Sequence, residues 1–324
     1  MIMSPNSSFT IVWDLETVPD AAAHTRMQGL PDLAPGDAEE QMGDKFPKLP
    51  LHRIVCLGAL IAERADGHWI TRSLGAPNVG ERTEREIIKS FVDRIGELRP
   101  QLVSFNGHGF DLPVLRYRAM LHSIHAPGLA RRPYFNRYTD DALDLCDVLS
   151  SYDARSKVSL DALSRFLGLA GKPDGVDGSQ VATLVRDGRI GEVADYCETD
   201  VVNTYRAWLR YELFRGSLGE AEFVASEADL TTFLSARLAT HPHLAALMQR
   251  WSRSSWVKIC CGLTIRMYPR HEARKDREGF WDAAAAGARS AKSRSSCRSA
   301  LRSSAAPATA QSPRAIDRRS ASRP

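Results

Sequence analysis

The sequence has no run of about eighteen apolar residues, the length that a helix needs to span a bilayer, so no membrane segment is expected. Residues Met1 to Asn6 carry neither a basic segment nor a long apolar core, and we expect no signal peptide. The six cysteines form no Cys-x-x-Cys pair and no zinc spacing. Cys56 and Cys197 lie in apolar patterns and are interpreted as small buried hydrophobic residues. These absences favour a cytoplasmic protein.

Acidic and basic residues are unequally distributed along the 324 residues of the chain. Up to Gln249 there are 26 Lys and Arg against 34 Asp and Glu, a net charge of −8. From Arg250 onward there are 17 against 5, a net charge of +12, which together give the formal +4 of the whole chain. An acidic domain repels a polyanion unless cations at its site reverse the local field.

The composition changes in the C-terminal part of the chain. From Asp282 it is rich in Ala, Ser, Arg and Pro and poor in large apolar residues, which cannot bury enough surface to fold. We predict a domain over 1–235, a partly helical extension over 236–280 and a disordered basic tail over 281–324. A frame change in a GC-rich reading frame is another origin for such a tail.

Hydrophobic periodicity indicates alternating strands and helices. Apolar residues with strand spacing predict strands over 9–17, 53–62, 69–74 and 101–105. Helical spacing and caps predict helices over 83–98, 114–121, 140–149, 159–167, 190–214 and 220–250.

The first predicted strand ends in two acidic residues. Its first half is apolar and β-branched, which predicts a buried central strand. Asp14 and Glu16 share one face, because residues two apart in a strand point the same way. Two carboxylates on a buried strand repel each other and lose hydration, so they need a cation, a donor network or a proton. The alternative is that both lie just past the strand end in water.

Two later segments place further acidic residues beside the predicted core. Asp111 lies where the strand over 101–105 gives way to a helix, so it is either a site carboxylate or the N-cap of that helix. Tyr196 and Asp200 are four residues apart on the helix over 190–214 and therefore share a face. A buried hydrogen-bonded pair without further function is the alternative for these two.

Together these segments form an Asp-x-Glu on a first strand, an Asn-x-x-x-Phe-Asp between a strand and a helix, and a Tyr-x-x-x-Asp on a late helix. In this order they resemble the DEDD 3′-5′ exonucleases of the ribonuclease H-like superfamily, in the branch with Tyr in the third motif. Within it, the chain is similar to bacterial stand-alone proteins described as predicted 3′-5′ exonucleases related to the family B polymerase exonuclease domain. The resemblance covers roughly 9–216. It implies an α/β fold with a mixed sheet of about five strands flanked by helices.

The resemblance also implies a two-metal site. Two divalent ions about 3.5–4 Å apart activate the attacking water and stabilise charge on the phosphate and the leaving oxygen. The expected ions are Mg²⁺, which prefers carboxylate oxygens, and Mn²⁺ can substitute. By the resemblance, Asp14, Glu16 and Asp200 hold the first ion, and Asp14 bridges to a second ion that Asp111 reaches directly or through water. Tyr196 is expected to orient the attacking water, since the reference pKa of a phenol, about 10, argues against deprotonation.

Four further residues are candidates for binding the substrate. Phe110 and Leu15 are expected to pack against the terminal bases, which suits an enzyme indifferent to sequence because every base has a π-face. Asn106 and Thr17 either hydrogen-bond the 3′ end or stabilise turns.

Other polar residues are interpreted as ordinary. No metal-ligand set is expected from His24, His52 and His108. A solvated helix face is the interpretation for the acidic run Asp140, Asp141, Asp144 and Asp147.

The predicted function is a metal-dependent 3′-5′ exonuclease that releases nucleoside monophosphates. Its expected partner is single-stranded nucleic acid with a free 3′ end, DNA rather than RNA. The alternatives are a 3′-5′ exoribonuclease of the same fold, since only contacts to the 2′-OH separate the two, and a non-catalytic nucleic-acid-binding module. A polymerase fragment is the last alternative, because no polymerase-sized segment follows.

Overall fold

The fold is built around a five-stranded sheet with the strand order β3-β2-β1-β4-β5. The computed structural model describes residues 7–31, 37, 40, 42–43, 46–171 and 178–252, so the predicted disordered tail lies outside the described residues. The strands are β1 (Phe9–Pro19), β2 (His52–Ala65), β3 (His68–Gly75), β4 (Gln101–Ser104) and β5 (Ala142–Asp144). The β1–β2 and β2–β3 pairs are antiparallel, and β4 runs parallel to both β1 and β5.

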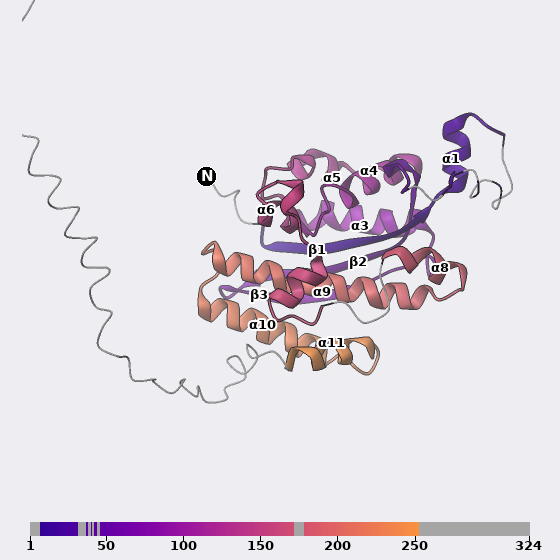
Figure 1. The fold of residues 1–324 in the computed structure, drawn as a ribbon. Coiled ribbons are helices and arrows are strands. Elements are labelled where there is room, and N and C mark those ends of the chain that lie inside the picture. The colour runs from indigo at the N-terminus through magenta and orange to yellow at the C-terminus, as the bar shows by residue number, and fades with distance from the viewer. Residues whose placement is uncertain are drawn as a thin grey trace, which may run out of the picture. The chain divides into compact units, whose positions relative to one another are not determined.

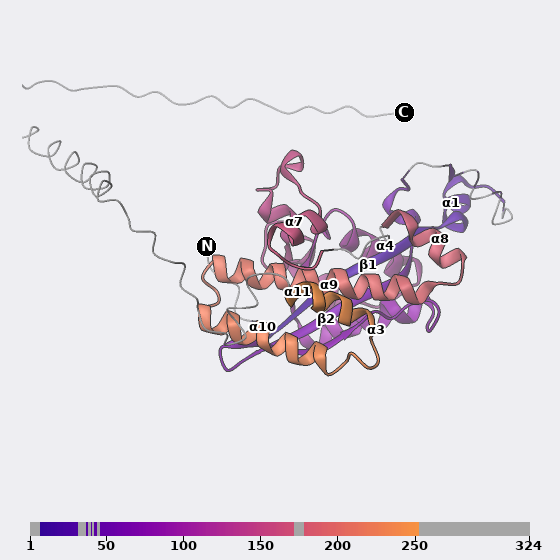
Figure 2. The same ribbon diagram turned by 60° about the horizontal axis from the view of Figure 1, so that its bottom comes forward.

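Helices cover both faces of this sheet (Figure 1). The side chains of Ile11, Trp13 and Leu15 pack into a core under α3 (Glu84–Leu98), α4 (Asp111–Leu121) and α5 (Pro127–Arg131). On the opposite face, Val12 joins a core with α9 (Ile190–Phe214), α10 (Glu220–Ser235) and α11 (His243–Ser252). Figure 2 shows α10 and α11 from their own side of the sheet. β1 is therefore buried on both faces, as its apolar first half predicts.

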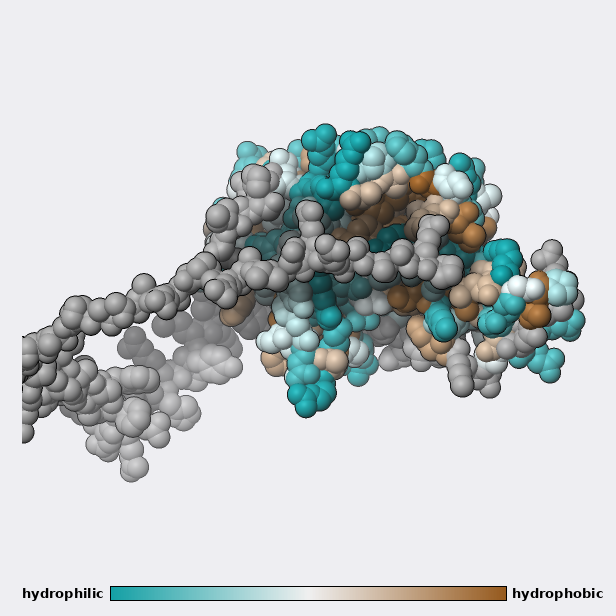
Figure 3. All heavy atoms as spheres, turned by 90° about the horizontal axis from the view of Figure 1, so that it is seen from above, coloured by the Kyte–Doolittle hydropathy of each residue, from teal (hydrophilic) through white to brown (hydrophobic). Residues whose placement is uncertain are grey.

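Shorter helices fill the connections: α1 (Ala21–Gln28), α6 (Leu145–Leu149), α7 (Leu160–Phe166) and α8 (Val181–Arg186). In Figure 3, which looks onto the fold from above the view of Figure 1, hydrophilic residues surround a hollow with partly hydrophobic walls. Among the described residues, no helix combines the length and the apolar character needed to cross a membrane.

The predicted ribonuclease H-like α/β class, a mixed sheet of about five strands flanked by helices, is confirmed by this arrangement. The helix over 190–214 is also confirmed, and α3 begins at the predicted place because Thr83 and Glu86 form a reciprocal capping box. The single helix predicted over 220–250 is two helices, α10 and α11. The boundary at 235 stays a prediction, and α11 beyond it buries Leu244 and Leu247 in the core with α9.

One predicted element was wrong. Residues 140–149 are not one solvated helix, because Ala142–Asp144 form strand β5 beside β4 and only Leu145–Leu149 are helical. Asp141, Asp144 and Asp147 are buried, with 8%, 2% and 1% of their surface exposed. Arg132 pairs with Asp141, and Arg137 and Lys157 pair with Asp147, so the burial of Asp141 and Asp147 is offset by cations.

Candidate active site

Strand β1 carries the first two candidate carboxylates. Asp14 lies opposite Gly58 and Glu16 opposite Cys56 on β2, so both are inside the sheet, which excludes the alternative that they lie past the strand end. Glu16 is buried and Asp14 is half-buried. A carboxylate oxygen of each and the Cys197 sulfur lie within 4.8 Å of one another. The alternation of the strand thus brings two acids to one spot, as the sequence predicts.

The first residue of α4 supplies a third carboxylate. The Leu15 N–H, between Asp14 and Glu16, donates a hydrogen bond of 3.0 Å to Asp111 Oδ1. Asp111 is not the N-cap of its helix, since Phe110 occupies that position. Burial raises the pKa of Asp111 to about 7, against the effect of the Leu15 hydrogen bond and with help from the charge of Asp144. The ionised form of this carboxylate therefore gains from any cation placed beside it.

A buried acid that the sequence analysis misread holds the loop before Asp111. The Asp144 carboxylate accepts hydrogen bonds from the backbone N–H groups of Asn106, at 2.7 Å, and His108, at 3.0 Å. Asn106 has a left-handed φ of +67°, which Asn adopts more readily than most residues. Gly107 is required because a Cβ there would meet Ser104 Oγ at 2.2 Å and Asp111 Oδ2 at 3.5 Å. Asp144 thus positions Asp111 from a strand that the sequence analysis did not find.

Helix α9 brings the remaining two candidates to the sheet. Tyr196 and Asp200 are both buried. Burial and the charges of Asp200 and Glu16 raise the pKa of Tyr196 well above its usual value, so the phenol keeps its proton. The helix comes close because β2 has a glycine opposite Asp14: a Cβ at Gly58 would lie 2.7 Å from the Cys197 sulfur.

Cys197 is close enough to Asp14 and Glu16 to be a candidate metal ligand. Its side chain is fully buried, and its contact with Cys56 together with burial raises the pKa of the thiol well above the usual value. A protonated thiol is a poor ligand, and hard cations such as Mg²⁺ prefer oxygen. Cys197 is therefore a small buried hydrophobic residue at the back of the site, as the sequence analysis interprets it.

The candidate substrate-binding residues have different surroundings. Leu15 is buried, and the Thr17 hydroxyl lies 3.0 Å from His52 Nδ1. Phe110 is partly exposed, and its ring contacts the edge of His52 at 4.8 Å and Phe46 at 6.0 Å between centroids.

Asn106, the fourth candidate, is exposed, and its side-chain oxygen accepts a 2.9 Å hydrogen bond from Lys157. Sequence reasoning missed Lys157, since it belongs to none of the three motifs. A lone lysine in a loop gives no signal of its own.

Comparisons with known proteins give the family. Residues 44–251 match the family model described as "Predicted 3'-5' exonuclease related to the exonuclease domain of PolB". The chain belongs to this family. The match includes Asp111, Tyr196 and Asp200. It starts after β1 and extends beyond residue 216, where the resemblance seen in the motifs ends, into α11.

Two solved structures are similar to the chain at low identity. One is the family B DNA polymerase from the hyperthermophilic archaeon Pyrobaculum calidifontis, with 17% identity and a TM-score of 0.44 over 66% of this chain and 25% of the polymerase. The other is a product-bound structure of exonuclease I, with 12% identity and a TM-score of 0.33 over 62% of this chain and 47% of that protein. The chain thus spans a quarter to about half of these proteins. No curated protein matches the chain.

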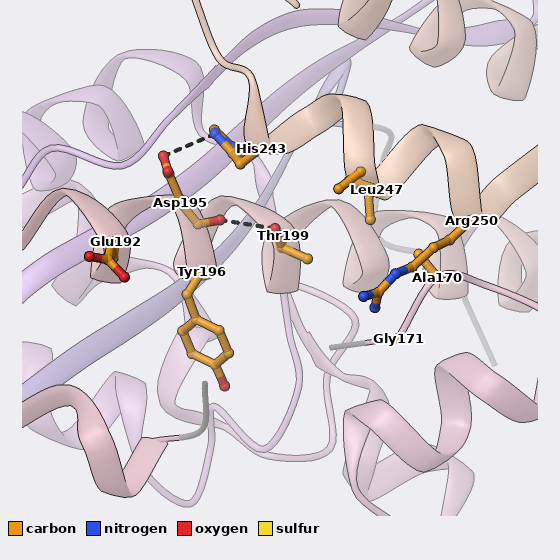
Figure 4. Close-up of a pocket in the computed structure, with 10 residues that line it drawn as sticks. Ala170, Gly171, Glu192, Asp195, Tyr196, Thr199, His243, Leu247 and Arg250 are labelled. Carbon is orange, nitrogen blue, oxygen red and sulfur yellow. Dashed lines mark hydrogen bonds and ion pairs between the residues drawn. The ribbon is translucent and has the colours of Figure 1, made fainter. Parts of the chain in front are cut away.

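The part of the family match beyond 235 includes a contact that sequence reasoning missed. His243 of α11 lies 2.9 Å from Asp195, and its Nε2 donates a 2.9 Å hydrogen bond to the Glu198 carboxylate, so it spans the turn of α9 that carries Tyr196 (Figure 4). A cavity of about 210 Å³ lies beside this contact, lined by Tyr196, Arg250 and eight others. A histidine outside the three motifs gives no indication in the sequence that it reaches this helix.

Proposed function

We propose that this protein is a metal-dependent 3′-5′ exonuclease that hydrolyses the phosphodiester bond at the 3′ end of single-stranded DNA and releases nucleoside monophosphates. The observation that carries the proposal is the hydrogen bond from Leu15 N–H to Asp111, because it fixes a carboxylate of α4 on the β1 backbone between Asp14 and Glu16. The family to which the chain belongs supports the reaction class.

The donor set fits hard divalent cations. Asp14, Glu16 and Asp111 offer only carboxylate oxygens, and the raised pKa of Asp111 means that a cation there stabilises its ionised form. In the proposed arrangement Asp14, Glu16 and Asp200 hold one Mg²⁺, and Asp14 with Asp111 the second. Two bound ions supply an activated water and stabilise charge on the phosphate and the leaving 3′ oxygen.

The protein's own groups have distinct parts in this proposal. Tyr196 keeps its proton and orients the attacking water by a hydrogen bond, since its pKa is raised by burial and by the acids around it. Phe110, beside the exposed Phe46, offers an aromatic surface to the terminal base. Thr17 and Asn106 carry polar groups for the terminal sugar and phosphate.

A gel assay tests the proposal with 5′-labelled single strands of DNA and RNA, in Mg²⁺ and again in EDTA. The Asp14→Ala and Asp200→Ala proteins run beside the wild type, and we expect each to lose about 10³-fold or more in rate while remaining folded, since a metal site supplies several kcal/mol of charge stabilisation. Asp93→Ala, which removes an exposed acid paired with Lys89 on α3, is the matched control and should retain full activity.

The products separate the possible substrates. A ladder of shortening DNA that needs both Mg²⁺ and Asp14 is the expected result. Preferential shortening of RNA would mean that the substrate is RNA, with the same proposed mechanism. Full activity in Asp14→Ala or in EDTA contradicts the proposed site. Binding that survives EDTA, with no product from either strand, points to a non-catalytic module.

A further inference from the structure

Two exposed tyrosines, one before β5 and one after α6, form a pair on the surface. Tyr138 has 68% and Tyr152 39% of its surface exposed, and the ring centroids are 5.1 Å apart with an interplanar angle of 56°. Aromatic rings usually bury most of their area, so a pair displayed in this way is an apolar surface open to a ligand.

The backbone that displays Tyr152 is strained. Ser151 and Tyr152 are consecutive residues with left-handed φ values of +52° and +62°, a conformation that residues with a side chain rarely adopt twice in a row. Hydrogen bonds hold the turn, from Tyr152 N–H to the Asp147 carbonyl at 2.8 Å and from Asp153 N–H to the Ser150 carbonyl at 3.1 Å. Strain of this kind persists where the surroundings enforce it and is concentrated at functional sites.

Two cations, Arg137 and Lys157, lie close to the pair. The buried carboxylate of Asp147 accepts two hydrogen bonds from Arg137, at 2.5 and 2.6 Å, and pairs with Lys157 at 3.0 Å. Asp140 and Asp144 also lie within electrostatic reach of Tyr152 and Arg137, so the two cations are set among acidic groups. The Arg137 guanidinium also lies 5.8 Å from the centroid of the Tyr152 ring, and 43% of its side chain is exposed.

Direct contacts connect the tyrosine pair with the proposed active site. Lys157 Nζ, which pairs with Asp147, also donates a 2.9 Å hydrogen bond to the side chain of Asn106. Asn106 opens the loop that ends at Asp111. A strand with its 3′ end at Asp111 therefore has a continuous series of side chains to follow: Asn106, Lys157, Arg137, Tyr152 and Tyr138.

We propose that Tyr138 and Tyr152 are a stacking platform for bases of the single-stranded DNA upstream of the terminal nucleotide, with Arg137 facing the backbone phosphate between them. The proposal rests on the function proposed above and extends it to the upstream part of the substrate. Stacking on aromatic faces tolerates any base, and a cation beside the rings attracts the phosphates of an otherwise acidic domain.

Kinetics on substrates of two lengths test the platform. The substrates are a trinucleotide and a strand of about 12 nucleotides, a length typical of such binding sites, and under the proposal only the longer strand occupies the platform. For the longer strand we expect Tyr138→Ala and Tyr152→Ala each to raise KM roughly 10-fold with kcat unchanged, the scale of one lost stacked base. For the trinucleotide, both variants should match the wild type. Tyr138→Phe and Tyr152→Phe keep the ring and should keep the wild-type KM.

Two further variants separate stacking from a structural role. Tyr152→Gly removes the ring and also relieves the left-handed strain, so it should bind the longer strand as weakly as Tyr152→Ala while its melting temperature stays the same or rises. Tyr117→Ala is the matched control: Tyr117 is also 39% exposed and lies beside an arginine, Arg116, but on α4 and without a second tyrosine. It should leave both substrates unaffected.

The outcomes are distinct. Equal losses on both substrate lengths, unchanged KM in both alanine variants, or the same loss in Tyr117→Ala would each overturn the platform. A wild-type protein that cleaves neither substrate would overturn the proposed exonuclease instead. A length-dependent loss confined to Tyr138→Ala, Tyr152→Ala and Tyr152→Gly supports the platform.

Discussion

Two groups of acidic residues lie on or next to β1 and α4. They differ in whether a side chain of the protein provides the cation that balances their negative charge. β1 provides Asp14 and Glu16 to the candidate active site, and Asp20, which follows the strand directly, belongs to a second cluster. α4 begins with Asp111 in the first group and, two turns later, places Arg118 in the second.

The second group, which we call the arginine cluster, has its cation built in. Arg118 is 2% exposed and donates hydrogen bonds to Asp20 at 2.6 Å and to both oxygens of Glu84 at 2.7 and 2.6 Å. Burial alone would raise the pKa of Asp20, but hydrogen bonds from Ala23 N–H and Arg118 hold it below its usual value. Asp20 is therefore ionised in the folded protein at neutral pH.

The negative charge of Asp111 is not balanced in this way. It is as deeply buried, at 3% exposed, yet no arginine or lysine in the described part of the chain pairs with it, and its pKa is raised. The two groups show that burial of an acid does not by itself indicate its role. The cation supplied by the fold makes the arginine cluster structural, whereas Asp111, buried without one, is suited to a cation that can exchange.

The largest expected effect is a loss of stability when the cation of the arginine cluster is removed. Arg118→Met leaves Asp20 and Glu84 buried without their cation, which should cost about 3–5 kcal/mol in the free energy of unfolding, measured by urea denaturation. Activity per folded molecule should be close to wild type. The triple variant Asp20→Asn, Glu84→Gln, Arg118→Met should recover most of the loss, because an uncharged replacement of the whole cluster leaves no unpaired charge. If Arg118→Met abolishes cleavage while folded, the contrast between the two groups fails.

Replacing Asp111 should raise the stability of the metal-free protein, whereas replacing Arg118 should lower it. The pKa of Asp111 rises from 3.8 in the unfolded chain to about 7 in the folded protein. The metal-free protein should therefore lose stability as the pH rises from about 4 to about 7, because the unfolded chain releases this proton first. Asp111→Asn carries no such proton, and above about pH 8 it should be more stable than the wild type by up to about 4 kcal/mol, at about 1.4 kcal/mol for each pKa unit. Thermal unfolding in EDTA across this pH range measures the difference.

Two controls sharpen this prediction. Asp147→Asn should destabilise the protein at neutral pH, because hydrogen bonds from Arg137 and Lys157 hold the pKa of Asp147 low despite the effect of burial. Adding Mg²⁺ to about 100 times its Kd should stabilise the wild type by about 2.7 kcal/mol and Asp111→Asn by less. An Asp111→Asn protein that is less stable than wild type in EDTA would contradict an exchangeable cation at this position.

The sequence predicts much of this fold where a signal is local. The alternation in β1 predicts that Asp14 and Glu16 share a face, and the spacing of Tyr196 and Asp200 predicts a common helix face, because neighbours within one element are set by its period. Thr83 marks the start of α3 for the same reason, since its capping partner is three residues away.

Partners far apart in the sequence were not predictable in this way. Asp111 has the sequence context of an N-cap, yet it accepts its hydrogen bond from Leu15, 96 residues away. Asp144 was misread as solvated because its donors, Asn106 and His108, belong to a loop nearly 40 residues earlier. A three-residue strand such as β5 is too short for a periodic signal and exists through its pairing with β4.

The smallest expected effect concerns geometry rather than charge. Gly58→Ala adds a methyl group opposite Asp14, 2.7 Å from the Cys197 sulfur and 3.0 Å from Val201, so α9 must shift away from the sheet with Tyr196 and Asp200. Overpacking of this kind costs about 1–3 kcal/mol, and a displacement near 1 Å at a catalytic group lowers kcat by about 10²-fold. Both are measured on the purified variant.

A neighbouring glycine provides the control for this test. Gly75 of β3 pairs with Ala59, next to Gly58, but a Cβ there meets nothing within 4 Å, so Gly75→Ala should change neither stability nor kcat. Adding Cys197→Ala to Gly58→Ala removes the closest overlapping atom and should restore part of the activity, a coupling expected only of residues in contact. If Gly58→Ala lowers stability but leaves kcat unchanged, the position of α9 is not critical. The carboxylates of β1 and α4 would then account for catalysis without the acid and the phenol on that helix.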